Sequence, residues 1–315
     1  MIDGSRVNGT LAQAATGRSA LRLKDRRVQG AIAFGLVLLW TLVMALNSEI
    51  GYDAIAYQAA GERLNAGHFL YSLSPGDRFL AMAPPYWNVA LMYPPLIAVL
   101  WRPIAALPGM LGYWTFIVAD AVAILWATAY VLRGLRADTI ALIAATSFAI
   151  GLQVTIGNVA GFLVVGYIAC WKYRDKPWIG LLIGFMAALK VTPGILILWL
   201  IGQRRWRALA WCLVALVGCL IVGTVGSSFD AHLQYLDVIR SSAPQPLSLT
   251  GLTGFGPATL IAQVGGALAV LALRGRPAWS FRVAILTMLV GSPAVGFQTP
   301  AILVAMAAPR EGEER

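Results

Sequence analysis

The sequence predicts an all-α, polytopic integral membrane protein, and its composition and the lengths of its apolar runs predict this class. Hydrophobic residues make up 59% of the 315 residues, charged residues only 12%, and the mean hydropathy is +0.73. A soluble domain is about 25% charged. The apolar runs are continuous rather than alternating, which indicates helices and not a barrel. At roughly 20 apolar residues per span, the chain has room for a bundle of about nine or ten transmembrane or short membrane helices.

The distribution of charge argues against nucleic acid as a partner. The net charge is +10, but the basic residues form short clusters at the ends of apolar runs. Such clusters are the topology signal of membrane proteins. The three cysteines, Cys170, Cys212 and Cys219, lie inside apolar runs without the spacing of a metal site or a disulfide, so we expect them to be core residues.

The first predicted span covers residues 30–46 and follows a polar, basic stretch at residues 1–29. No small-residue cleavage site follows the apolar run, so we expect a cytoplasmic tail and a retained span. Basic residues before the span and the acidic Glu49 and Asp53 after it orient it from inside to outside. The basic residues are Arg18, Arg22, Lys24, Arg26 and Arg27.

A polar loop at residues 47–92 follows on the outer side. It holds four of the fourteen acidic residues, Glu49, Asp53, Glu62 and Asp77. Residues 54–65 predict a short helix that ends at Gly67 and lies flat at the membrane surface. Residues 72–95 are rich in proline, glycine and aromatic residues and predict a loop. Because nearly everything that follows is apolar, we expect the chemistry to lie in this polar stretch.

The remaining apolar runs predict further spans or short membrane helices. Their ranges are 94–107, 111–132, 140–151, 159–171, 178–201, 208–225, 257–273, 283–296 and 301–308. The pair 140–151 and 159–171 is too short to cross upright and predicts a packed hairpin of short helices. Residues 227–256 predict a second outer loop, and residues 309–315 a charged tail.

Strict alternation of spans from an inner N-terminus leaves one conflict. It places Arg102 near the inner end of the second span and the basic residues of 204–207 and 274–282 inside, as the positive-inside rule requires. It also places two basic clusters outside, against that rule. These clusters are Arg133 with Arg136, and Lys172 with Arg174 and Lys176. Either the short pair does not cross fully, or the outer cations bind anionic ligands.

Asp53 and Lys190 are the strongest candidates for chemistry. Asp53 precedes a predicted helix, so it is either an N-cap residue or a carboxylate at the membrane boundary that takes a proton from a sugar hydroxyl. Lys190 lies in an apolar run, where an ammonium needs a cavity or a partner. Pro193 favours a kink beside it. Lys190 therefore either faces a ligand or forms an ion pair with Asp120 of the third span.

Other polar residues carry weaker signals. Tyr93 begins a Tyr-Pro-Pro helix start and could also line an external cavity. Arg240 in the second outer loop either pairs with a phosphate or is solvated. His68 and His232 are the only histidines and lie far apart, which favours surface positions. The chain has no Walker loop, GxGxxG after a strand, HExxH or nucleophile elbow, so we expect neither soluble-type nucleotide chemistry nor a cofactor, and a lipid-linked substrate is easier to reach.

Several short motifs together resemble the GT-C membrane glycosyltransferases. The nearest match is glycosyltransferase family 87, whose members are polyprenol-phosphate-mannose-dependent α-mannosyltransferases. The acidic residue after the first span is followed by Tyr57, Ala60, Leu64, Gly67 and Tyr71, and then by YPPL at 93–96. The Gly157-Asn158 pair is similar to the family's GQxN turn. AALKVTP at 187–193 with RRWRA at 204–208 resembles AALKPTP…RRWRA, and SPAVGFQTP at 292–300 resembles SPxSWxHH.

The resemblance implies a GT-C-like fold and an enzyme of the bacterial plasma (inner) membrane. Such a hexosyltransferase moves a sugar, usually mannose, from a polyprenyl-phosphate donor to a lipid or glycan acceptor on the outer face. It implies Asp53 as the general base of an inverting, metal-independent displacement, Lys190 near the donor phosphate or sugar, and the second outer loop over the lipid carrier. The candidate substrate-binding residues are Tyr57, Tyr93, Lys190, Arg240 and Gln298.

Departures from the family pattern leave two alternatives open. Gln298-Thr299 replaces the family's His pair, Asn158 lacks the intervening Gln, and the chain ends soon after Pro309, about two spans short of the usual member. A transporter or flippase that uses Asp120 and Lys190 is the first alternative, although no internal repeat is visible. A non-catalytic assembly protein is the second.

Overall fold

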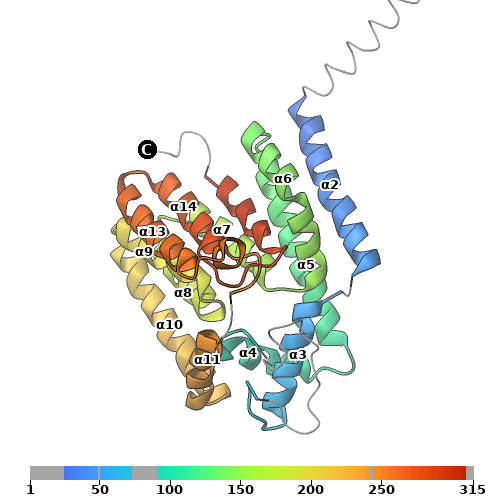
Figure 1. Cartoon of the computed structure of the whole chain (residues 1–315), viewed down its shortest axis with the longest axis vertical. Helices are drawn as coiled ribbons and strands as arrows, with labels where there is room; N and C mark the ends of the chain where they lie inside the picture. The colour runs from blue at the N-terminus through green and yellow to red at the C-terminus, as the bar shows by residue number, and fades with distance from the viewer. Residues whose placement is uncertain (1–24, 49, 73–90, 242–243, 310–315) are drawn as a thin grey trace, which may run out of the picture.

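The computed structural model describes residues 25–48, 50–72, 91–241 and 244–309, and every regular element in these ranges is helical (Figure 1). The all-α prediction is therefore confirmed. Glu49, Asp77, most of the basic N-terminal tail, most of the 72–95 loop and the end of the charged tail lie outside the described residues.

The helices follow one another along the chain. Their bounds are α2 (Arg26–Asn47), α3 (Tyr52–Asn65), α4 (Pro95–Ala105), α5 (Leu111–Leu132), α6 (Ala137–Ile156), α7 (Ala160–Lys172), α8 (Ile179–Leu189), η1 (Thr192–Gly194), α9 (Ile195–Gly202), α10 (Trp206–Gly226), α11 (Phe229–Ser241), α12 (Leu249–Thr253), α13 (Ala258–Ala272), η2 (Leu273–Gly275), α14 (Pro277–Val290) and η3 (Thr299–Ala307).

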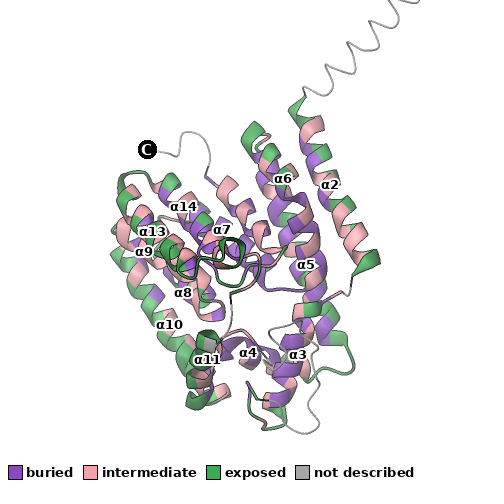
Figure 2. Ribbon diagram, viewed as in Figure 1, coloured by how far each residue is buried: buried purple, intermediate pink, exposed green. Residues whose placement is uncertain are grey.

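Five helical segments in the described part of the chain are long and apolar enough to cross a membrane: α2, α5, α6, α10, and α13 with η2. Five shorter apolar segments accompany them: α4, α7, α8, η1 with α9, and α14. α10 and α13 expose most of their surface, whereas α7 is mainly buried (Figure 2). The chain is thus a multi-pass membrane protein, with some helices against lipid and others inside the bundle.

The prediction of two short helices at 140–151 and 159–171 is correct for the second helix and wrong for the first. α7 is short, with 13 residues, but α6 is a full helix of 20 residues. The helix continues through Gln153 and Thr155 because both side chains are buried inside the protein, where they find hydrogen-bond partners. It ends only at Gly157, which adopts a left-handed conformation with φ 66°.

The prediction that the second apolar run crosses the membrane is wrong. α4 has only 11 residues and packs beside α3. The Asn65 amide donates to the Arg102 carbonyl at 2.9 Å, and Arg102 Nε donates to Asn65 Oδ1 at 3.0 Å. Arg102 Nη1 also donates to the carbonyl of Gly226, the last residue of α10, at 3.0 Å. Arg102 therefore lies at the same end of the bundle as α3 and not at the inner end of a span.

The run 178–201 also does not cross as one span. α8 ends at Leu189, Lys190 is extended (φ −147°, ψ 131°), and Thr192-Pro193 begins the next helical turn. Arg205 Nη2, which follows α9, lies 3.0 Å from Asp175 Oδ1, which precedes α8. The start of α8 and the end of α9 therefore lie next to each other, and the pair forms a re-entrant hairpin.

The C-terminal helices form a second hairpin of this kind. α14 ends at Val290, and η3 begins at Thr299-Pro300. Arg282, near the start of α14, donates to the carbonyls of Met306 and Pro309 at 3.3 and 3.2 Å. Arg136, before α6, donates to the same Pro309 carbonyl at 2.6 Å. The start of α14 and the end of η3 therefore lie beside the α5–α6 turn.

These departures from strict alternation remove the charge conflict. With α4 kept at one end and two hairpins that turn back, every basic turn lies at the other end of the bundle (Figure 1). We call this the basic end. Its residues are Arg26, Arg27, Arg133, Arg136, Lys172, Arg174, Lys176, Arg204, Arg205, Arg207, Arg274, Arg276 and Arg282. α3, α4 and α11 lie at the opposite end.

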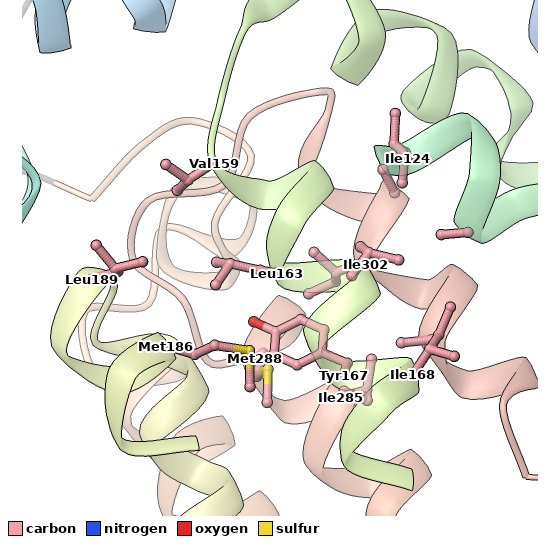
Figure 3. Close-up of a cluster of buried hydrophobic side chains, with 14 of the residues drawn as sticks. Ile124, Val159, Leu163, Tyr167, Ile168, Met186, Leu189, Ile285, Met288 and Ile302 are labelled. Carbon is pink, nitrogen blue, oxygen red and sulfur yellow. The ribbon is translucent and has the colours of Figure 1, made fainter. Parts of the chain in front are cut away.

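α7 runs through the centre of the bundle and is packed on several sides. Figure 3 shows its apolar side chains against residues of α5, α8, α14 and η3. The labelled residues are Ile124, Val159, Leu163, Tyr167, Ile168, Met186, Leu189, Ile285, Met288 and Ile302. This core fixes the N-terminus of α7 relative to both hairpins, and the candidate site is built around that N-terminus.

Candidate active site

Asp53 lies in the first turn of α3, but it does not cap that helix. The cap position belongs to Gly51, which is left-handed with φ 77°. The Gly51 N–H donates to the Thr155 carbonyl at 2.7 Å, and the Tyr113 hydroxyl donates to the Ile50 carbonyl. These contacts hold the α2–α3 junction against the end of α6. The N-cap interpretation of Asp53 is therefore wrong, and its carboxylate is available for another role.

Asn158 connects Asp53 to the rest of the site. Its amide nitrogen donates to Asp53 Oδ2 and, at 2.8 Å, to the Tyr93 hydroxyl. Its Oδ1 accepts from the Ala160 N–H at 2.9 Å in the first turn of α7. Because Oδ1 faces a backbone donor, the amide nitrogen must point to Asp53. Asn158 is buried, so this orientation is fixed.

Gly157 allows Asn158 to approach α3. A Cβ at Gly157 would lie 3.0 Å from the Ala54 Cβ and 3.2 Å from the Gly51 Cα, and its φ is +66°. Glycine is thus required for both conformation and space. The sequence alone indicates Asn158 only through the family resemblance and does not place it in the site. The one local signal was a Gly-Asn pair directly after an apolar helix.

Gln153 and Asp120 form a buried layer behind Asn158. The Gln153 amide nitrogen donates to Asp120 Oδ2 at 3.1 Å and to the Asn158 carbonyl at 3.0 Å. Both side chains have 0% exposure. Asp120 also faces the first turn of α7, since a Cβ on Gly161 would meet its Oδ1. A carboxylate is favoured at a helix N-terminus. Asp120 is therefore not the ion-pair partner of Lys190, contrary to that alternative.

Lys190 contacts Tyr93, whose hydroxyl also accepts from the Asn158 amide. Its Nζ is 5.6 Å from the centroid of the Tyr93 ring. It also lines a small cavity of about 20 Å³, enough for one or two water molecules. The other lining residues are Ala160, Leu163, Tyr167, Thr192, Met288, Ser292, Ala294, Thr299 and Ile302. They come from α7 and from the breaks in both re-entrant hairpins, and they add four hydroxyl groups to the ammonium.

The environment of Asp53 shifts its proton affinity. Burial raises the pKa of the Asp53 carboxyl, and the Lys190 charge and the Asn158 hydrogen bond partly offset this effect. The carboxylate thus faces one cation and one amide donor in a site with little water. A raised pKa makes it a better proton acceptor than an exposed aspartate.

Tyr57 and Tyr93 form the aromatic part of the site. The Tyr57 side chain is fully buried and packs edge-on against the Tyr93 ring, with 5.0 Å between centroids. Trp101 and Phe116 lie on its other sides at 5.8 and 5.9 Å. The Tyr71 hydroxyl donates to the Tyr93 carbonyl at 2.6 Å. Tyr57 therefore supports Tyr93, which contacts both the Asn158 amide and Lys190.

The other two candidates do not join the contacts of Asp53, Asn158 and Tyr93, and Lys190 alone among the candidates lines the cavity. Arg240 is exposed on α11, and its Nη1 lies 3.6 Å from Asp237 Oδ1. Gln298 precedes η3 and is half-buried, but the neighbouring Thr299 lines the cavity in its place. Among the described residues no group of three or more His, Cys, Asp or Glu side chains could hold a metal ion. His232 Nδ1 lies 3.1 Å from the Ser228 carbonyl.

Comparisons with known proteins point to one family. The model of glycosyltransferase family 87 matches residues 91–293, which include Asn158 and Lys190 but not Asp53. A polyprenol-phosphate-mannose-dependent alpha-(1-2)-phosphatidylinositol pentamannoside mannosyltransferase of Mycolicibacterium smegmatis is 27% identical over 75% of this chain. The protein of that name from Mycobacterium tuberculosis is 25% identical over 77% of it. The matches cover 61% of each relative, so the chain spans about three fifths of their length. No solved structure matches it.

Proposed function

The chain belongs to glycosyltransferase family 87, and from this premise we propose that it is a hexosyltransferase with Asp53 as its general base. It moves a sugar, which we propose is mannose, from a polyprenyl-phosphate carrier to a lipid acceptor. The observation that supports this most is the Asp53 carboxylate, which accepts from the Asn158 amide and is close enough to Lys190 for its charge to act on it, with Tyr93 in contact with both Asn158 and Lys190. The names of the two relatives support polyprenyl-phosphate-mannose as the donor and suggest a mannosylated phosphatidylinositol as the class of acceptor.

The proposed reaction is a single inverting displacement. Asp53 takes the proton of the acceptor hydroxyl as the acceptor oxygen forms a bond to the sugar C1. The bond between C1 and the phosphate oxygen breaks, and polyprenyl phosphate leaves with the electron pair. Lys190 and the cavity hydroxyls stabilise the negative charge that develops on the phosphate. A metal-dependent enzyme would use a divalent cation to stabilise this negative charge. Because Lys190 supplies a positive charge in that role, we propose a metal-independent reaction.

The small volume of the cavity bears on how the donor binds. A cavity of about 20 Å³ is too small for a sugar phosphate. Binding therefore requires side chains at the two hairpin breaks to move apart. Lys190 is half-buried at one break, and Ser292 and Thr299 line the other, so these polar groups lie where such an opening would expose them.

The orientation follows from charge. Cytoplasmic loops carry the excess of Lys and Arg, so we propose that the basic end faces the cytoplasm, as does the N-terminus of α2. α3 and Asp53 then lie at the outer face of a bacterial plasma membrane. A transporter that uses Asp120 and Lys190 receives less support, because Asp120 is fully buried, bonds to Gln153 and does not line the cavity.

A transfer assay tests the proposed function. Purified protein in liposomes is incubated with polyprenyl-phosphate-[¹⁴C]mannose or the corresponding glucose donor, together with a membrane lipid extract. We expect labelled glycolipid from the mannose donor, formed in proportion to protein. Proteoliposomes that accumulate donor in the opposite leaflet without any new covalent product would instead indicate a transporter.

A further inference from the structure

α11 has three distinct sides, and only one of them packs on the protein. Ala231, Tyr235 and Val238, at helical spacing, belong to the core or pack against it, and the Tyr235 ring lies 6.0 Å from the Tyr71 ring. This inner side fixes the rotation of the helix about its axis. The other two sides face away from the bundle and differ sharply in character.

The second side is apolar and uncovered. Its residues are Phe229, Leu233, Leu236 and Ile239, with 61, 48, 46 and 45% of their surfaces exposed. They recur every three or four residues and so form one stripe along the helix. No other described part of the chain covers this stripe. Exposure of apolar side chains to water is unfavourable, so a less polar medium is expected against this stripe.

The third side is charged. Asp230 and Asp237, seven residues apart, are both exposed and point roughly a quarter turn away from the apolar stripe, and the exposed Arg240 places its Nη1 3.6 Å from Asp237 Oδ1. An apolar and a charged side, adjacent on one short helix whose third side is held by protein, suit a boundary between lipid and water.

The position of α11 in the bundle identifies the medium. It begins three residues after α10 ends, at the end opposite the basic end (Figure 1). α10 is long and apolar enough to span, and its exposed residues continue to its last turn. Among them are Val217, Leu220, Ile221 and Val225, with 57, 49, 57 and 82% exposed. The lipid-facing surface of α10 therefore leads directly to the apolar stripe of α11 (Figure 2).

We propose that α11 lies in the membrane interface, with its Phe229–Leu233–Leu236–Ile239 stripe on the lipid acyl chains and Asp230 and Asp237 in water. A second protein is a poorer occupant. Stable protein–protein interfaces bury about 800 Å² on each partner and include 20–30 residues from each. This stripe has four apolar side chains and lies beside two carboxylates, Asp230 and Asp237.

This placement sets the level of the membrane at the candidate active site. The inner side of α11 contacts Tyr71 through Tyr235, and the Tyr71 hydroxyl holds the Tyr93 carbonyl. The membrane boundary at α11 thus passes close to Tyr93 and Asp53. If the proposed function holds, a lipid-linked substrate reaches the site without leaving the membrane, but the position of α11 itself does not depend on that function.

Site-directed spin labelling tests the proposal without any activity assay. The background variant is Cys219→Ser, since Cys170 and Cys212 are fully buried and Cys219 is not. Single cysteines are introduced as Leu233→Cys, Leu236→Cys, Asp230→Cys and Asp237→Cys, all at exposed positions. Val217→Cys on α10 serves as the lipid reference, and Lys176→Cys at the basic end as the water reference. Each is labelled with a nitroxide in liposomes, and its collisions with oxygen and with an aqueous nickel chelate are measured.

We expect the labels at 233 and 236 to collide with oxygen as the Val217 reference does, and those at 230 and 237 with nickel as the Lys176 reference does. The ratio of the two accessibilities should differ several-fold between Leu236→Cys and its neighbour Asp237→Cys. Nickel accessibility at 233 and 236 equal to that at 237 would place the stripe in water and overturn the proposal. Loss of both accessibilities at 233 and 236 would mean that protein covers the stripe, and would overturn it as well.

Discussion

The Asp53→Asn variant is expected to transfer sugar with a kcat about 10²–10⁴-fold below that of the native protein, the usual contribution of a general base. Asparagine has the shape of aspartate but accepts no proton at neutral pH. Its own Oδ1 can still accept from the Asn158 amide, so the local structure should persist. KM should change little, because the lost interaction acts on the proton in transfer. Initial rates with the labelled donor measure both constants.

Asp230→Asn is the matched control for this variant. Asp230 is an exposed carboxylate at the same end of the bundle, on α11 and away from the cavity. It should keep the native kcat, and both variants should unfold at the native temperature. An Asp53→Asn protein with native kcat would contradict the assignment of the base.

Replacement of Asn158 by leucine should have the second largest effect. Leucine fills the same space but cannot donate to Asp53 or Tyr93, nor accept from the Ala160 N–H. A displaced catalytic group can cost about 10²-fold in rate, and we expect a loss of that order in kcat. Because the Asn158 hydrogen bond lowers the pKa of Asp53, its loss should also move the acid limb of the pH–rate profile upward.

The pH profile separates this role from a purely structural one. Loss of the hydrogen bond between Asn158 Oδ1 and the Ala160 N–H alone costs about 1 kcal/mol of stability and leaves the acid limb of the pH–rate profile where it is. Thr146→Val offers a comparison, since it removes a buried hydroxyl of α6 that bonds only within its own helix. That variant should lose some stability and keep the native profile. If Asn158→Leu folded and showed the native kcat and acid limb, Asn158 would not position the base.

The sequence predicts the class of fold but not the path of every helix. Composition and apolar run length are enough for an all-α membrane bundle. The run 94–107 resembles a short span, and nothing local shows that Arg102 bonds to Asn65 and Gly226, which lie 37 and 124 residues away. Lys190 and Pro193 do predict a break. The reversal of the chain there depends on the distant contact between Arg205 and Asp175 and cannot be inferred from the break itself.

The site shows the same division between local and distant signals. Asp53 stands out because an acidic residue after a span, directly before a short helix, is an unusual local pattern. Asn158 does not stand out, because its two side-chain partners are 105 and 65 residues away. Gln153 is hidden for the same reason. The sequence alone pairs Asp120 with Lys190, because both are charged residues in apolar runs, whereas in the fold Asp120 accepts from Gln153 and Lys190 contacts the Tyr93 ring.

The pH dependence of kcat/KM tests the assignment of Asp53 most directly. Burial raises the pKa of its carboxyl more than Lys190 and Asn158 lower it. A base must be ionised to accept a proton, so activity should fall as the pH drops through this raised pKa. We expect an acid limb at a higher pH than an exposed aspartate would give, and no such limb in the residual activity of Asp53→Asn. The same limb in both proteins would show that another group is the base.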